Sequence, residues 1–170
     1  MVNLTTKEIF LLEGEKYQQQ LAIDKYNDYA LQADDNNLKR LFTNLSNIEQ
    51  KHLNMIDKIL QGNIPSINNQ EFHPYYENNS NNSIYHLNIG NITLTPINND
   101  PYHDGDKIIC FNALATQELL HSTYSTSNLE FENQDLKKVL DFIINEKSQS
   151  INYINEYMSN KGMNDNIIFF

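Results

Sequence analysis

A carboxylate and an imidazole stand three residues apart in Glu49-Gln50-Lys51-His52. On a helix this spacing places both side chains on one face. Carboxylates can bridge two divalent cations while an imidazole binds one of them, as in helical bundles with a di-iron or di-manganese centre. Glu-x-x-His is also common on helices by chance, so its meaning depends on the other ligands that such a centre needs.

Helical periodicity places this pair within a predicted hairpin of two helices over residues 5–62. Apolar residues recur every three or four positions on both sides of the turn-favouring run 34–37. Gly62 is suited to end the second helix. Glu49 and His52 lie on the apolar stripe of that helix, so we expect both to face the core.

A second helical hairpin is predicted over 108–162, and the chain between the hairpins has a different character. The insert 63–107 holds all four prolines and several Asn pairs, and no helical period survives there. A weak alternation over 84–95 leaves open a small β-hairpin or an irregular connection. The tail 163–170 ends in four apolar residues that are expected to dock on the bundle or on a partner.

The two hairpins align with each other when the chain is shifted by 98 residues. The identical pairs include Gln19/Gln117, Tyr26/Tyr124, Leu38/Leu136, Asn47/Asn145 and Ile56/Ile154. Two repeated hairpins joined by one long crossover have the connectivity of a ferritin-like four-helix bundle. We therefore predict one all-α, ferritin-like domain over residues 1–170, in which each hairpin buries the apolar stripe of the other.

The repeat also tests the metal hypothesis, because it locates the remaining ligand positions. The six positions expected to hold ligands carry Gln19, Glu49, His52, Gln117, Lys147 and Ser150. A neutral amide is a poor substitute for a bridging carboxylate, and a charged lysine only donates hydrogen bonds. The sequence therefore predicts a vestigial centre without metal or other cofactor, in which Lys147 faces Glu49 and its ammonium replaces the cations.

Two alternatives remain for this centre: another alignment of the two hairpins, and a bound metal ion. A shift by one residue aligns Glu146 with Glu49, but Glu146 would then point away from the apolar stripe, so Lys147 is the preferred match. A single weakly bound metal at Glu49 and His52 is the other alternative.

Composition excludes several classes of function. The 170 residues include 12 Lys and Arg against 22 Asp and Glu, a net charge of −10 that disfavours a nucleic-acid surface. No apolar run approaches the length of a membrane span, and the N-terminus lacks the pattern of a secretory signal. The single cysteine, Cys110, is expected to be a buried structural thiol.

One acidic cluster outside the centre has residue types that could bind a divalent cation. Asp100, His103, Asp104 and Asp106 crowd one loop, but their spacing does not match an EF-hand. We predict a solvated loop cluster.

Several short motifs in the second hairpin, in order and spacing, resemble the Coat F family of spore-coat proteins. They are Cys110, Leu114-Ala115-Thr116, Ser122-Thr123-Tyr124, Leu136, Val139-Leu140, Asn145-Glu146-Lys147, Tyr157-Met158 and Gly162-Met163. The first hairpin, with Gln18-Gln19-Gln20-Leu21 and Glu49-Gln50-Lys51-His52, is similar to the N-terminal half of longer members. The resemblance implies a ferritin-like bundle in the endospore coat, made in the mother-cell cytoplasm without a secretory signal.

Three functional hypotheses follow. The first is a non-catalytic structural protein of the spore coat, with other coat proteins or further copies of itself as partners. The second is an iron or manganese oxidoreductase of rubrerythrin or manganese-catalase type that uses Glu49 and His52. The third is a cytosolic adaptor that binds a protein partner through the insert 63–107.

Overall fold

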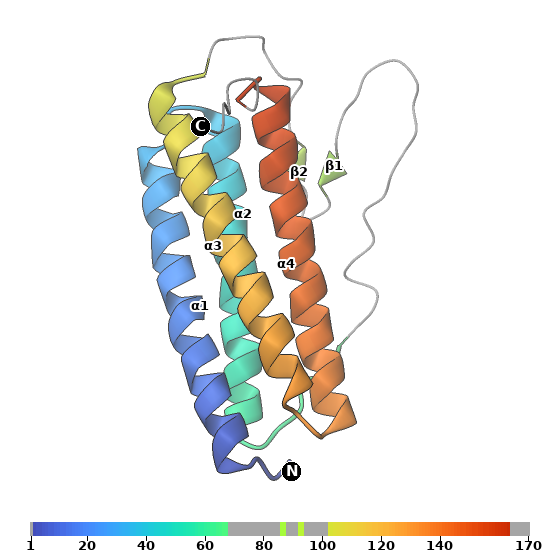
Figure 1. Ribbon diagram of the computed structural model, residues 1–170. Helices are drawn as coiled ribbons and strands as arrows, with labels where there is room; N and C mark the ends of the chain where they lie inside the picture. The colour runs from blue at the N-terminus through green and yellow to red at the C-terminus, as the bar shows by residue number, and fades with distance from the viewer. Residues whose placement is uncertain (1, 68–85, 88–91, 94–101, 164–170) are drawn as a thin grey trace, which may run out of the picture.

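The computed structural model describes residues 2–67, 86–87, 92–93 and 102–163. Most of these residues belong to four long helices. They are α1 (Thr6–Gln32), α2 (Asn36–Leu60), α3 (Asp104–Leu129) and α4 (Gln134–Asn160). The helices lie side by side, with α1 and α4 running up the page and α2 and α3 running down it (Figure 1). The end of α2 and the start of α3 therefore lie at opposite ends of the molecule.

Local sequence explains where the first hairpin begins and turns. Thr5 and Glu8 form a capping box at the start of α1, in which each side chain pairs with the other residue's backbone N–H. Asp35 caps α2. Gly62 follows the end of α2 with a φ of 83°, a conformation that glycine adopts without steric cost.

The second hairpin begins earlier than its sequence pattern predicts. α3 starts at Asp104 rather than near residue 108, so the expected insert of 63–107 is shorter by its last residues. Asp104 and Asp106 lie in the first helical turn, where negative charge favours the helix N-terminus. The predicted solvated cluster is wrong for Asp106, which is buried; Asp100 lies outside the described residues.

A small antiparallel hairpin is described within the insert. Strand β1 (His86–Leu87) pairs with β2 (Ile92–Thr93), with His86 opposite Thr93. Of the two alternatives for this segment, the β-hairpin is the one described. The remainder of the insert and the apolar tail predicted to dock lie outside the described residues.

The 98-residue repeat appears again in the hydrogen bonds that join the hairpins. Asp106, in the first turn of α3, accepts hydrogen bonds from the backbone N–H groups of Asp34 and Asp35 at 2.8 and 3.1 Å. Glu8, in the first turn of α1, likewise accepts from the N–H of Glu132 at 3.5 Å. Glu8 and Asp106 are 98 residues apart, as are Asp34 and Glu132, so each helix start secures the turn of the other hairpin in the same way.

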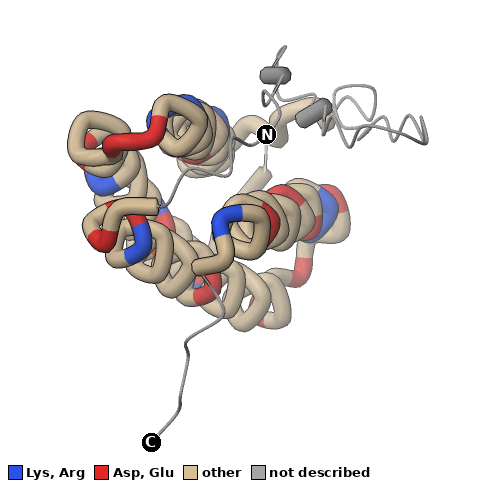
Figure 2. The backbone as a smooth tube through the Cα atoms, turned by 90° about the horizontal axis from the view of Figure 1, so that it is seen from above, with Lys and Arg blue, Asp and Glu red and all other residues tan. Residues whose placement is uncertain are grey.

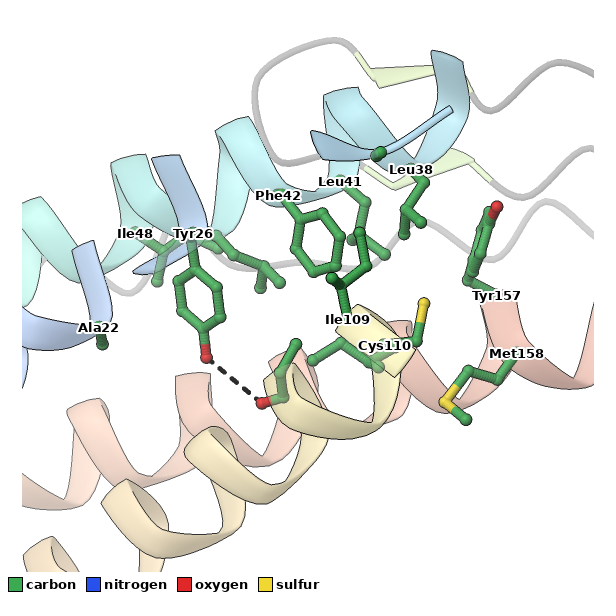
Figure 3. Packing of buried hydrophobic residues seen from close by; sticks show 14 of the residues in the cluster. Ala22, Tyr26, Leu38, Leu41, Phe42, Ile48, Ile109, Cys110, Tyr157 and Met158 are labelled. Carbon is green, nitrogen blue, oxygen red and sulfur yellow. Dashed lines mark hydrogen bonds between the residues drawn. The ribbon is translucent and has the colours of Figure 1, made fainter. Parts of the chain in front are cut away.

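The apolar core is divided into two clusters along the helices. One contains Tyr26, Phe42 and Ile109, and the other contains Leu12, Ile56 and Leu140. In the first cluster the rings of Tyr26 and Phe42 are stacked with centroids 6.3 Å apart, while the Tyr26 hydroxyl donates to a backbone carbonyl of α3 (Figure 3). Between the two clusters lies a layer of buried polar side chains.

Charged residues occur on all four helices (Figure 2). Among the described residues, none of the helices combines the length and the apolarity that crossing a membrane requires.

Candidate functional site

The polar layer in the middle of the bundle contains all six residues that the repeat singled out. They are Gln19 on α1, Glu49 and His52 on α2, Gln117 on α3, and Lys147 and Ser150 on α4. Each has no exposed surface. Each is placed there by helical spacing, because its neighbours three or four residues away belong to the apolar core.

Glu49 is the hub of this layer, and the predicted pairing with Lys147 is confirmed. Lys147 Nζ donates to Glu49 Oε2 at 2.7 Å. Gln117 donates to the other carboxylate oxygen at 2.6 Å, and Gln19 donates through Nε2 to Oε2. The carboxylate therefore receives hydrogen bonds from three helices, two of them from the amides that occupy expected ligand positions.

These contacts keep Glu49 ionised. Burial alone would raise the pKa of this carboxyl group, but the charge of Lys147 and the hydrogen bond with His52 lower it to about 2. Lys147 also lies over the ring of Tyr124, 5.1 Å from its centroid, and donates to Gln19 Oε1 at 3.3 Å. The ammonium thus has a carboxylate, an amide oxygen and an aromatic face as partners.

Glu146 corrects the sequence interpretation. The sequence predicts that it points off the apolar stripe, yet it is 97% buried. Its carboxyl group shares a hydrogen bond with His52 Nε2. The other ring nitrogen of His52 lies 3.3 Å from Glu49 Oε2. Two successive residues of α4, Glu146 and Lys147, therefore both reach the centre. Lys147 is the partner of Glu49, as predicted, but the expectation that Glu146 points away is wrong, because two adjacent positions of a wide buried face can point inward.

Ser150 takes a smaller part than its position suggested. Its hydroxyl donates to the backbone carbonyl of Glu146 at 3.0 Å, one turn earlier on the same helix. This bond lies within α4 and does not involve the ion pair of Glu49 and Lys147. Because Ser150 is the repeat mate of His52, the second hairpin contributes no imidazole at the matching position.

The donor set fits a di-metal site poorly. Glu49 and Glu146 lie against opposite nitrogens of the His52 ring, so these two carboxylates do not converge with the imidazole on one point. Lys147 places its ammonium 2.7 Å from Glu49 Oε2, where it would repel a metal cation. In the described part of the chain, no three His, Cys, Asp or Glu side chains are arranged to hold one ion.

Glu15 is a buried carboxyl group that the sequence analysis missed. It lies one helical turn before Gln19 and is 1% exposed, and neither carboxylate oxygen is within hydrogen-bonding geometry of a polar group among the described residues. Burial raises its pKa to about 7, although the nearby Ser127 and the charge of Lys147 oppose this. The signal was present in the sequence, since Glu15 lies on the same helical face as Leu12 and Gln19, but its repeat mate is the uninformative Ala113.

The thiol of Cys110 is buried, as predicted, and belongs to the apolar cluster that contains Tyr26 and Phe42 (Figure 3). Burial, together with the charges of Asp106 and Asp35, raises its pKa to about 12. A thiol held in this neutral form is a packing residue rather than a nucleophile.

The comparison with protein-family models assigns residues 105–165 to the Coat F domain. This part of the chain is similar to the Coat F domain. This Coat F segment spans α3, α4 and the turn between them, and it contains Gln117, Glu146 and Lys147. The resemblance inferred from the sequence is confirmed for the second hairpin, whereas the similarity of the first hairpin to longer members stays a prediction. Neither a curated protein nor a solved structure matches the chain.

Proposed function

We propose that this protein is a non-catalytic structural component of the bacterial endospore coat, built on a ferritin-like bundle whose di-metal centre has been replaced by a buried ion pair. The Coat F match supports a spore-coat protein. The single observation that carries the structural role is the buried bond between Lys147 and Glu49, because it fills the position of the metals with a side chain of the chain itself.

The ferritin-like scaffold is supported by connectivity and by the repeat. Both hairpins have N-caps 98 residues apart, at Asp35 and Asn133, and both secure the opposite turn through an acid in the first helical turn. The helix directions also require a connection that crosses the length of the bundle (Figure 1). We take residues 1–170 as one domain with this pseudo-twofold organisation.

The outer surface supports assembly with other proteins. Exposed apolar side chains recur at matching positions of the two hairpins, in the pairs Phe10/Ile108, Leu21/Leu119 and Leu31/Leu129. Large apolar groups at such exposed positions are typical of contact surfaces. Two equivalent surfaces on one chain suit a component of an extended coat layer, made with other coat proteins or with further copies of the chain.

Spore fractionation tests the proposed location. An epitope-tagged chain is expressed from its own locus in the organism that encodes it, and purified spores are extracted to separate coat, cortex and core. The account expects the protein in the coat extract and its absence from the core. A chain found in the vegetative cytoplasm and excluded from spores would favour the adaptor hypothesis instead.

A further inference from the structure

Lys147, Gln19 and Glu49 are arranged as the parts of an acyl-transfer reaction. Lys147 Nζ lies 3.3 Å from Gln19 Oε1 and 2.7 Å from Glu49 Oε2. The same Glu49 oxygen accepts a hydrogen bond from Gln19 Nε2. One carboxylate oxygen therefore touches both the amine and the amide nitrogen that would leave.

The amide carbonyl of Gln19 has a second hydrogen-bond donor. The Tyr124 hydroxyl donates to Gln19 Oε1 at 3.0 Å. A donor at this position would stabilise negative charge on the oxygen as a tetrahedral intermediate forms. Tyr124 has no exposed surface, and burial raises its pKa well above the ordinary value, so the hydroxyl keeps its proton for this bond.

We propose that Lys147 and Gln19 join in an intramolecular isopeptide bond that links α4 to α1, with release of ammonia. The bond would connect residues 128 positions apart in the chain. It is a modification site built from the centre itself. The inference rests on the metal-free centre of the proposed function but not on the location of the protein in a coat.

The reaction balances without an external reagent. Glu49 takes one proton from the Lys147 ammonium, and the free amine attacks Cδ of Gln19. Glu49 then gives its proton to the departing amide nitrogen and takes a second proton from the attacking nitrogen. One ammonium and one primary amide become one secondary amide and one ammonia, and Glu49 ends as a neutral acid.

The buried environment favours this outcome. Gln19, Glu49 and Lys147 are inaccessible to solvent, so water does not compete with the amine for the amide carbon. The reaction also removes a pair of buried charges, because the ammonium becomes an amide and the carboxylate is protonated. The ammonia leaves as a small neutral molecule.

Mass spectrometry of the full-length protein tests the proposal. The expected intact mass is about 17 Da below that of the unmodified chain, the mass of the ammonia released in this lysine acylation. Asparagine side chains that cyclise lose the same mass, so the bond is located by digestion and fragmentation. A branched peptide that joins Gln19 to Lys147 is the expected result.

Three variants separate the roles of the residues. Lys147→Arg keeps a cation beside Glu49 but removes the amine, and should abolish the branched peptide. Glu49→Gln leaves amine and amide in place but removes the proton carrier, and should also abolish it. Tyr124→Phe should lower the cross-linked fraction several-fold in freshly made protein. Circular dichroism tests whether each variant is folded. If a variant does not fold, the mass and the peptides of the wild-type protein still test the proposal.

Two results would overturn the inference. One is wild-type protein that keeps its full mass after prolonged incubation and yields separate peptides for Gln19 and Lys147. The other is a branched peptide between Glu49 and Lys147, formed with loss of about 18 Da as water rather than ammonia. Elemental analysis of the same sample distinguishes the two proposals: bound metal without a cross-link contradicts the metal-free centre, whereas a metal-free, uncross-linked sample contradicts the isopeptide bond alone.

Discussion

The two hairpins share a framework and differ at their centre. Asp35 and Asn133 cap α2 and α4 at equivalent positions, and Glu8 and Asp106 bind equivalent turns. At the middle of the bundle the first hairpin contributes the acid Glu49, whereas the second contributes a lysine at the matching position. The peripheral hydrogen bonds follow the symmetry of the repeat, whereas the Glu49–Lys147 pair in the buried polar layer does not.

This difference has a simple electrostatic reason. Two carboxylates at equivalent buried positions repel each other unless cations lie between them. A lysine at one of the two positions supplies the missing positive charge within the chain. In the proposed metal-free centre, the same lysine occupies the space that cations would need, so it both stabilises Glu49 and disfavours metal binding.

Breaking the central pair should have the largest effect. In protein that has not formed the bond between Gln19 and Lys147, Lys147→Met leaves Glu49 buried without its cation, so the free energy of unfolding should fall by about 3–5 kcal/mol. Chemical denaturation followed by circular dichroism measures this. Lys138→Met is a matched control, because that exposed lysine pairs with Asp135 on the surface and should change stability by less than about 0.5 kcal/mol.

The double variant Glu49→Gln/Lys147→Met sharpens this test. Removing both charges should recover most of the loss caused by Lys147→Met alone, because a neutral amide is less costly to bury than an unpaired carboxylate. A coupling energy near zero between the two substitutions would mean that the pair does not interact as described.

Glu15 makes the stability of the folded protein depend on pH. Its repeat mate in the second hairpin, Ala113, has no titratable group. The pKa of Glu15 is raised to about 7 from an ordinary 4.5, so the folded state holds a proton that the unfolded state releases. Stability should therefore fall as pH rises from about 5 to 8, by up to roughly 3 kcal/mol. Glu49, whose pKa is lowered, contributes the opposite slope but only below about pH 4.5.

Glu15→Gln should flatten this decline. Denaturation curves at pH 5 and pH 8 measure the difference for the variant and for the wild type. An equally steep decline in the variant would assign the pH dependence to another group.

The equivalent acids of the two turns should differ in strength. Asp106→Ala removes two hydrogen bonds to backbone N–H groups, and we expect a loss of about 2 kcal/mol. Glu8→Ala removes the capping box and one long contact with Glu132, and we expect about 1 kcal/mol. Equal losses, measured as shifts of the denaturation midpoint, would show that the two turns are energetically as well as geometrically equivalent.

The two N-caps provide the finest comparison. Asp35→Ala and Asn133→Ala should each cost about 1 kcal/mol, because each removes bonds to two backbone N–H groups. Asp35→Ala should cost a few tenths more, because Asp35 also pairs with the mostly buried Lys161 at 2.7 Å. Thermal unfolding of the two variants in parallel measures the difference, and a costlier Asn133→Ala would contradict it.

Periodicity and the repeat predicted the four helices and the partner of Glu49, because both depend on the regular spacing of apolar residues. They failed where burial does not follow that pattern. Glu15 and Glu146 are buried acids whose repeat mates, Ala113 and Ile48, carry no charge, so the repeat did not single them out. The early start of α3 depends on Asp106 binding the turn at 34–35, a contact between distant parts of the chain.

Metal binding tests the central claim most directly. The purified chain, made without a metal-affinity tag, is offered iron(II) and manganese(II), desalted and analysed by elemental mass spectrometry. A variant with Gln19→Glu, Gln117→Glu, Lys147→Glu and Ser150→His, which restores the expected ligands, serves as the positive control. The account predicts no stoichiometric metal in the folded wild-type chain. Two metal ions per wild-type chain would contradict it and would move the oxidoreductase hypothesis to first place.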